Sequence, residues 1–197
     1  MKRGAVFLDK DGTLLLDRPG GPEVATMELM PGAARGLRRL SAAGLPLIVA
    51  SNQTGVAMGR FPEQVLTAVG QRLFEMLSEI GVPLTGFWYC PHHPDGQVPA
   101  YAVECGCRKP RPGLLLAARQ HHDIDLSESW LIGTALDDIE AGGRAGCHTI
   151  FLDTGHETGW RSGPYRTPDA IACDLWDAAA VILGARSPDR AMSKGGR

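Results

Sequence analysis

Short apolar runs alternate with longer amphipathic segments along most of this 197-residue chain. Brief apolar runs bounded by glycine or polar residues are typical of buried parallel strands, and apolar residues at helical spacing indicate the helices between them. The predicted strands are 5–8, 45–50, 85–89, 130–133, 148–152 and 170–173, and the predicted helices are 31–43, 62–80, 114–120, about 137–145 and 174–183. This alternation predicts an α/β fold, with a doubly wound and mostly parallel sheet covered by helices on both faces.

Length and composition indicate one domain, which we place at residues 1–185. The hydrophobic content of 44% is sufficient for a substantial core, and the polar tail 186–197 is predicted to be disordered. A formal charge of −2 gives no electrostatic footprint for nucleic acid, and no apolar run approaches the roughly 18 residues of a membrane span. The first strand begins so close to Met1 that no signal peptide is expected. We therefore expect a cytoplasmic monomer.

Two carboxylates, Asp9 and Asp11, come directly after the first predicted strand, and Gly12 follows them. In an open α/β sheet ligands bind at the carboxyl ends of the strands, so both acids are placed where a reaction centre belongs. Carboxylates this close repel each other unless a cation or a shared proton stabilises them. The alternative interpretation is an acidic turn, because Asp-Gly is common in turns.

Polar residues also follow the second predicted strand, in the run from Ser51 to Gly55. Ser51 and nearby backbone N–H groups could hold an oxyanion, although serine and asparagine equally cap helices. The Pro- and Gly-rich segment 16–26 is a candidate substrate rim or a simple surface connection.

Three of the five cysteines crowd into the segment 90–107, together with a His-His pair. Cys90 and His92 flank one residue, Cys105 and Cys107 flank another, and twelve residues separate the two pairs. A Cys₃His set is a regular structural zinc site, so we predict that Zn²⁺ staples this loop, with His92 preferred over His93 by symmetry of spacing. Buried thiols beside a surface histidine pair are the alternative.

Basic residues Arg108 and Lys109 follow the predicted zinc loop and precede a predicted helix. A lysine beside a helix start suits an anionic group, although such clusters are often only solvated turns. After the fourth strand, Asp137 and Asp138 fall in the first turn of a helix, where the helix dipole favours carboxylates even without a function.

Taken together, these residues resemble the haloacid dehalogenase-like phosphatases. Their four signatures match, in order, Asp9 to Thr13, Ser51 to Gln53, Lys109, and Gly133 to Asp138. The resemblance is greatest to the D-glycero-D-manno-heptose-1,7-bisphosphate and histidinol-phosphate phosphatases, and the runs that carry it are 51–55, 90–94 and 105–110. It spans roughly residues 4–155 and implies a structural zinc and no large cap domain.

The resemblance also implies an activity, the hydrolysis of a small sugar phosphate or bisphosphate. Asp9 would attack phosphorus to form an aspartyl-phosphate, and Asp11 would act as general acid and then general base. Ser51 and Lys109 would bind phosphoryl oxygens. The substrate contacts implied are Asn52, Gln53 and Arg108, and the Mg²⁺ ligands implied are Asp9, Asp11 and Asp138, with Asp137 as a further candidate.

One position departs from the family pattern. The fourth signature ordinarily begins Gly-Asp, and that aspartate binds Mg²⁺ directly, whereas here the residue is Thr134. A neutral hydroxyl is a poorer ligand for a hard cation than a carboxylate. The segment 17–22 also lacks the aromatic and histidine residues that heptose enzymes tend to carry. An active magnesium-dependent phosphatase and a catalytically weakened member that binds phosphorylated ligands or a partner therefore both stand as hypotheses.

Overall fold

The computed structural model describes residues 2–17, 23–155, 161 and 163–185. These residues form a six-stranded parallel sheet in the order β3-β2-β1-β4-β5-β6. The strands are β1 (Val6–Leu8), β2 (Leu47–Asn52), β3 (Leu84–Cys90), β4 (Trp130–Gly133), β5 (His148–Leu152) and β6 (Ala170–Ala172). The predicted α/β architecture is confirmed, although β2 extends two residues further than predicted, so that Ser51 and Asn52 lie within the strand.

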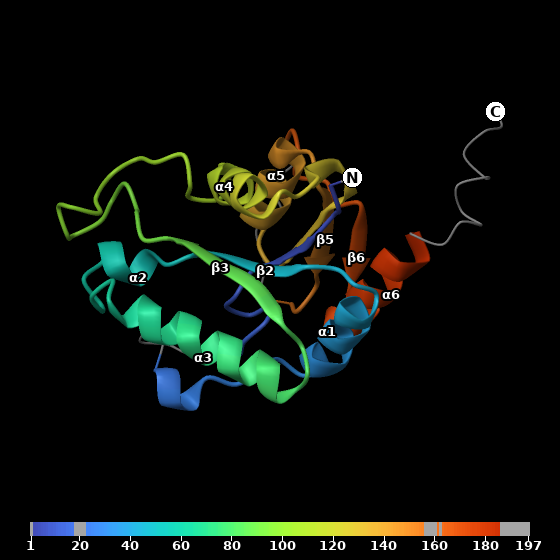
Figure 1. Ribbon diagram of the computed structural model, residues 1–197. Helices are drawn as coiled ribbons and strands as arrows, with labels where there is room; N and C mark the ends of the chain where they lie inside the picture. Colours follow the sequence, from blue (N-terminus) through green and yellow to red (C-terminus); the bar gives the residue numbers. More distant parts are fainter. Residues whose placement is uncertain (1, 18–22, 156–160, 162, 186–197) are drawn as a thin grey trace.

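Helices connect the strands on both faces of the sheet (Figure 1). They are α1 (Ala33–Ala42), α3 (Val65–Glu79), α4 (Gly113–His122), α5 (Leu136–Ala145) and α6 (Leu175–Ala185), with a one-turn helix α2 (Thr54–Ala57) and 3₁₀ turns η1 (Val24–Thr26) and η2 (Leu126–Glu128). The three short elements were not predicted, because a single turn is too short for a periodic pattern to reveal it.

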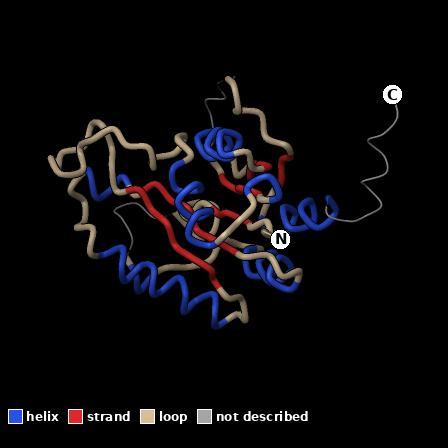
Figure 2. Tube along the Cα trace, turned by 45° about the horizontal axis from the view of Figure 1, so that its top comes forward, coloured by secondary structure: helices blue, strands red, loops and turns tan. Residues whose placement is uncertain are grey.

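Alternating side chains along the buried strands divide the core into two layers. Val6 and Leu8 of β1 belong to a cluster with residues of α1, α3 and α6, whereas Phe7 belongs to a second cluster with α4 and α5. Successive side chains of a strand point to opposite faces, so a continuous apolar run serves both layers. Figure 2 shows the strands running between these two sets of helices.

The centre of the sheet contains a topological switch point. From β1 the chain adds β2 and β3 on one side, and then returns to place β4 on the other side of β1. Crevices at such a point, outside the carboxyl ends of the strands, are where open α/β sheets bind ligands. The chain leaves β1 at Asp9, so this acid enters the crevice.

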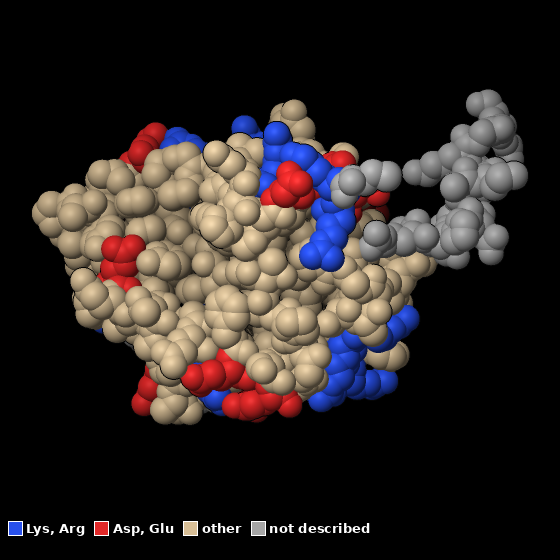
Figure 3. All heavy atoms as spheres, in the orientation of Figure 1, with Lys and Arg blue, Asp and Glu red and all other residues tan. Residues whose placement is uncertain are grey.

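Some predictions fall on residues that the structure does not describe. The tail 186–197 lies outside the described residues, as do positions 18–22 of the suggested substrate rim. No helix in the described part of the chain is long and apolar enough to cross a membrane. On the face shown in Figure 3, basic and acidic side chains form small separate groups rather than one broad patch of either sign.

Candidate active site

The backbone around Asp9 is held between two strands. Its N–H donates to the carbonyl of Ile132 in β4 at 2.9 Å. Gly12 then adopts a φ of 75°, in the left-handed region that glycine enters without a steric penalty, and its N–H bonds the carbonyl of Leu15 at 2.8 Å. This tight turn keeps Asp9 and Asp11 at the carboxyl end of β1.

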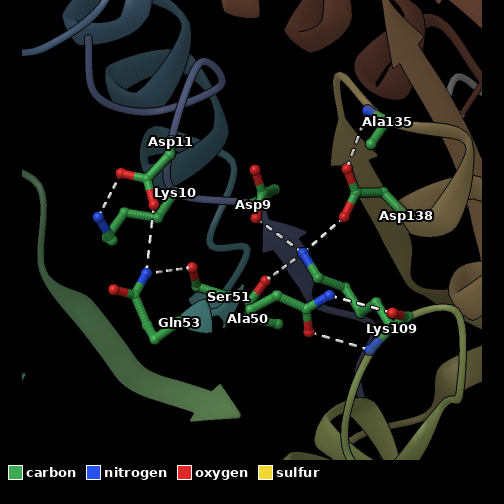
Figure 4. Close-up of polar contacts among 10 residues, drawn as sticks. Asp9, Lys10, Asp11, Ala50, Ser51, Gln53, Lys109, Ala135 and Asp138 are labelled. Atoms are coloured by element: carbon green, nitrogen blue, oxygen red, sulfur yellow. Dashed lines mark hydrogen bonds and ion pairs between the residues drawn. The ribbon is translucent and has the colours of Figure 1, made fainter. Parts of the chain in front are cut away.

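Lys109 reaches Asp9 from a loop that is 100 residues away in sequence (Figure 4). Its Nζ donates to Asp9 Oδ1 at 2.7 Å, to the Ala50 carbonyl at 2.8 Å and to Asp138 Oδ1 at 2.5 Å. Only 2% of the lysine side chain is exposed. A buried ammonium is stable only when opposite charges and hydrogen bonds replace its water, and here two carboxylates and a carbonyl do so.

Burial and charge act in opposite directions on the two partners. Burial raises the pKa of Asp9 to about 6, although the Lys109 ammonium opposes the rise. Burial by itself would lower the pKa of Lys109, but Asp138 and Asp9 outweigh it and hold that pKa above its ordinary value. Lys109 is therefore a permanent positive charge beside Asp9, as a binding site for a phosphoryl group requires.

The Asn52 side chain binds the main chain of Lys109. Asn52 Nδ2 donates to the Lys109 carbonyl and the Lys109 N–H donates to Asn52 Oδ1, both at 3.0 Å. The resemblance implies that Asn52 contacts substrate, and in the structure its amide binds the lysine backbone on both sides. Its contacts are those of a residue that positions Lys109.

Asp11 faces different partners from Asp9. Lys10 forms an ion pair with Asp11 Oδ1, and Gln53 Nε2 donates to Oδ2 at 3.2 Å. Gln53 Nε2 also lies 2.8 Å from Ser51 Oγ. Ser51 and Gln53 are buried, whereas the Asp11 side chain is 38% exposed. The residues implied for phosphate binding and proton transfer thus meet at the ends of β1 and β2.

The acidic residues at the start of α5 differ in their contacts. Asp138 is buried, with one oxygen on Lys109 Nζ and the other accepting the Ala135 N–H at 3.1 Å. Asp137 forms an ion pair with Arg166 at 3.0 Å. The resemblance implies Asp138 as a Mg²⁺ ligand, with Asp137 as a further candidate; in the structure Asp138 pairs with the lysine and Asp137 with Arg166.

Thr134 adjoins the first signature, at the position where the family carries its metal-binding aspartate. Its Oγ1 lies 3.5 Å from the point where a side chain on Gly12 would begin. The hydroxyl is therefore at the turn that follows Asp11, on the β4 side of the crevice.

The four predicted zinc ligands come together in one cluster. Sγ atoms of Cys90, Cys105 and Cys107 lie 3.2–3.4 Å apart, and His92 Nδ1 lies 3.6 Å and 3.7 Å from two of them. Tetrahedral ligands at the usual Zn–S distance of about 2.3 Å would be separated by about 3.8 Å, so the cluster fits a single Zn²⁺. His93 is not part of it, and its Nδ1 accepts the N–H of Asp95 at 3.1 Å.

A hollow lies beside the zinc loop, next to Lys109. Arg108 donates to Thr54 Oγ1 at 2.9 Å and to the His92 carbonyl at 3.1 Å, so its guanidinium is tied to α2 and to the loop. Arg108, Lys109 and Arg111 line a hollow of about 420 Å³, together with the carboxylates of Asp95, Glu104 and Asp137. Arg111 pairs with Glu104 at 2.9 Å, so within this lining of mixed charge it is Arg108 that offers a guanidinium to an anionic ligand.

Two contributions to the site were not anticipated from the sequence. Lys10 was read only as part of the first signature, yet it is 3% exposed and paired with Asp11. The Ala50 carbonyl accepts from Lys109, a role that no residue type could indicate because every residue has this group. A lysine inside an otherwise buried segment was the available signal for Lys10.

Comparisons with known proteins agree with this geometry. The HAD-hydrolase-like family profile matches residues 106–178. The chain is 37% identical over 172 residues to the D-glycero-beta-D-manno-heptose-1,7-bisphosphate 7-phosphatase of Escherichia coli K12, and the match covers 87% of this chain and 86% of that protein.

Solved structures show the same fold. The D,D-heptose 1,7-bisphosphate phosphatase from B. bronchiseptica, complexed with magnesium and phosphate, is 26% identical, with a TM-score of 0.76 over 92% of this chain and 99% of that one. The corresponding phosphatase from Burkholderia thailandensis, at 20% identity, has a TM-score of 0.64 over 92% and 99% of the two chains. The chain belongs to the haloacid dehalogenase-like phosphatases, in the group that contains the heptose-1,7-bisphosphate phosphatases.

Proposed function

We propose that this protein is a magnesium-dependent phosphatase that hydrolyses a small sugar bisphosphate through an aspartyl-phosphate, with heptose 1,7-bisphosphate as the leading substrate. The observation that carries the proposal is the pairing of Asp9 with Lys109 at the switch point of the sheet. Packing does not require a buried lysine between two acids, because apolar residues of similar volume would fill the space at lower cost. A site that binds phosphate does require it.

The first chemical step forms a bond between Asp9 and phosphorus. An Asp9 carboxylate oxygen attacks, the bond from phosphorus to the ester oxygen breaks, and its electron pair stays on that oxygen. Asp11 donates a proton to the departing oxygen, so the product is a neutral alcohol. Lys109 Nζ and Ser51 Oγ donate to the phosphoryl oxygens, where negative charge is concentrated in the transition state.

The second step hydrolyses the acyl phosphate. Asp11, now a carboxylate, takes a proton from water as the water oxygen attacks phosphorus. The bond to Asp9 breaks and its electron pair returns to the Asp9 carboxylate, releasing inorganic phosphate. The same acid thus serves once as proton donor and once as proton acceptor, and the site is restored.

The residues present fit Mg²⁺, although with fewer charged ligands than is usual in the family. Asp9 has one carboxylate oxygen bound to Lys109, which leaves Oδ2 for a cation. Asp9 Oδ2, the Asp11 carbonyl and Thr134 Oγ1 would hold it, and all three are the hard oxygen ligands that Mg²⁺ prefers. Bound Mg²⁺ would supply charge neutralisation of the phosphoryl oxygens.

A bisphosphate suits the surroundings of the reaction centre. The hollow beside Lys109 offers Arg108 to an anionic group, and the relatives that match over most of the chain are named as heptose bisphosphate phosphatases. Histidinol phosphate is the alternative substrate, because the sequence resembles that group too.

Phosphate release from a panel of esters tests the proposal. Heptose 1,7-bisphosphate, the corresponding monophosphate, fructose 1,6-bisphosphate and histidinol phosphate would be compared with and without Mg²⁺. We expect the heptose bisphosphate to give the highest kcat/KM and EDTA to abolish its hydrolysis. A higher kcat/KM for histidinol phosphate would identify that ester as the substrate in place of the heptose bisphosphate. Hydrolysis of none of the esters in the panel would contradict the proposed activity.

A second candidate function, phosphoester binding without efficient turnover, is favoured by one residue. Thr134 removes a negative charge from the metal site, which weakens its attraction for Mg²⁺. Binding of a bisphosphate by the wild-type protein without release of phosphate at millimolar Mg²⁺ would support this candidate over the enzyme.

Restoring the missing carboxylate with Thr134→Asp is expected to tighten Mg²⁺ binding roughly tenfold or more, since a charged ligand replaces a neutral one. Turnover of a generic aryl phosphate at low Mg²⁺ should rise with it. Calorimetric titration of metal into both proteins measures the affinity directly, and Thr134→Asn controls for the change of shape. Equal Mg²⁺ affinity in wild type and Thr134→Asp would show that the threonine is no defect in this site.

The pKa of Asp9 predicts the acid side of the pH profile. Attack needs the carboxylate, so the reactive fraction increases as pH rises through about 6. At low Mg²⁺, kcat/KM should therefore fall about tenfold for each pH unit below this value. Metal and proton compete for Asp9, so saturating Mg²⁺ should move this limb to lower pH. Measurements of kcat/KM against pH at several Mg²⁺ concentrations check this result. If the pH at which kcat/KM falls does not change with the Mg²⁺ concentration, Asp9 is not both the nucleophile and a metal ligand.

A further inference from the structure

Asp11 is held on both of its carboxylate oxygens by buried side chains. The Lys10 ammonium pairs with Oδ1, and Gln53 Nε2 donates to Oδ2 at 3.2 Å. The exposed fraction is 3% for Lys10 and 4% for Gln53, whereas it is 38% for the Asp11 side chain. Figure 4 shows Asp11 turned toward these two residues, while Asp9 faces Lys109. A half-exposed acid is thus fixed by two partners that are themselves fixed by packing.

The orientation of the Gln53 amide follows from its neighbours. When Asp11 is ionised, as it must be to take a proton from water in the second step, its carboxylate only accepts hydrogen bonds, and the Gln53 atom that faces it is the donor Nε2. The same nitrogen donates to Ser51 Oγ at 2.8 Å. A hydroxyl that accepts from Gln53 keeps its own proton free, so Ser51 can donate to a phosphoryl oxygen. Gln53 therefore connects the phosphate-binding hydroxyl with the proton-transferring acid.

We propose that Lys10 and Gln53 are positioning residues that aim Asp11 for both of its proton transfers. The inference rests on the proposed function, in which Asp11 protonates the ester oxygen as its bond to phosphorus breaks and then takes a proton from the attacking water. Neither residue contacts the reacting phosphorus. Proton transfer depends steeply on the placement of donor and acceptor, and an unrestrained carboxylate at this exposure would spread over several rotamers.

The proposal predicts a selective defect that depends on the leaving group. An alkyl phosphate needs a proton on its departing oxygen, whereas 2,4-dinitrophenolate departs without one. Loss of the Asp11 clamp (Lys10 and Gln53) should therefore slow the first step for alkyl esters only. The second step uses Asp11 whichever ester was attacked, so phosphoenzyme should accumulate from the dinitrophenyl ester.

The experiment compares Lys10→Met and Gln53→Met, which keep length and lose the donors, with wild type. Both variants should lose about 10²-fold in kcat/KM for glycerol phosphate, the contribution typical of a positioned acid or base. With the dinitrophenyl ester, the initial burst of dinitrophenolate, which measures formation of the phosphoenzyme, should stay near the wild-type rate. The phosphoenzyme should be visible by mass spectrometry after an acid quench. Lys10→Arg should recover most of the activity, because a guanidinium can reach the same carboxylate oxygen.

Lys2→Met is the matched control, since Lys2 pairs with Asp123 on the surface and should leave both rates unchanged. Thermal unfolding and zinc content establish that each variant is folded. Two outcomes would overturn the proposal. In the first, both esters lose the same factor in kcat/KM and no phosphoenzyme accumulates, which would show that the clamp has only a structural role. In the second, both methionine variants keep wild-type rates. If the wild type in Mg²⁺ hydrolyses neither these two esters nor heptose 1,7-bisphosphate, the proposed function fails and this inference fails with it.

Discussion

Asp9→Asn is expected to lower phosphatase turnover by at least about 10⁴-fold, because the amide keeps the shape of the side chain and loses the attacking charge. Folding should survive the change. Lys109 would retain Asp138 and the Ala50 carbonyl as partners, so its charge would not be left unpaired. Burial already disfavours the charged form of Asp9, as its raised pKa shows, so removing that charge should not destabilise the metal-free protein. Phosphate release and thermal unfolding measure the two effects.

Two further variants make the result specific. Asp123→Asn changes an exposed carboxylate far from the crevice and should leave turnover unaltered. Asp11→Asn should also be severely impaired, yet it should trap phosphoenzyme from an ester whose leaving group needs no proton. Turnover by Asp9→Asn within tenfold of wild type would rule out an aspartyl-phosphate on this residue.

Loss of the zinc cluster is the second large effect that we expect. Cys107→Ser removes one of three thiolates, and it lies two positions before Lys109, so both zinc content and Lys109 placement should suffer. Structural zinc contributes folding free energy directly, and we expect a lowered unfolding temperature and at least about 10²-fold less activity. Elemental analysis should find one zinc per wild-type chain and little in the variant.

The link from the cluster to the reaction centre is continuous. The Arg108 N–H donates to Cys105 Sγ at 3.3 Å, and the next N–H, that of Lys109, donates to Asn52. On the far side of the loop, Tyr101 donates to Glu63 at 2.7 Å and ties the loop to the segment that precedes α3. Without the metal, the loop would be held by hydrogen bonds such as these and those from Arg108 to Thr54 and to the His92 carbonyl.

Cys173→Ser is the control for the zinc variant, because Cys173 is an exposed thiol outside the cluster. It should keep both zinc and activity. Chelation of the wild type should reproduce the Cys107→Ser defect, and readdition of Zn²⁺ but not of Mg²⁺ should reverse it. Purified protein with no zinc and three freely titratable thiols at Cys90, Cys105 and Cys107 would contradict the assignment.

Local patterns in the sequence were sufficient for the fold and for the zinc cluster. The six strands and five longer helices lie where the spacing of apolar residues predicts them, because this spacing indicates which strands and which helix faces are buried. The cluster of Cys90, His92, Cys105 and Cys107 was predicted because metal ligands occur in close pairs. Each apolar repeat and each pair of zinc ligands spans only a few residues, so both patterns can be recognised locally.

The contacts of individual site residues were harder to predict. The pattern predicts a polar amide at position 52 near the site, but not its hydrogen bonds to the Lys109 main chain, 57 residues away. It predicts a carboxylate at position 138, but not the ion pair of this group with Lys109 Nζ. Residue type shows that an amide or a carboxylate is available, but not which of several nearby partners it meets.

Local sequence patterns are enough to predict a parallel α/β sheet, a group of acids and a lysine at its carboxyl edge, and a loop that carries a zinc ligand set. These properties depend on residue type and short-range spacing. The positions of Lys109 between Asp9 and Asp138, and of Gln53 beside Asp11, depend on the three-dimensional fold. These contacts join the ends of β1 and β2, the first turn of α5 and a loop, and they exist only once the order of the strands brings residues that are distant in sequence within hydrogen-bonding distance.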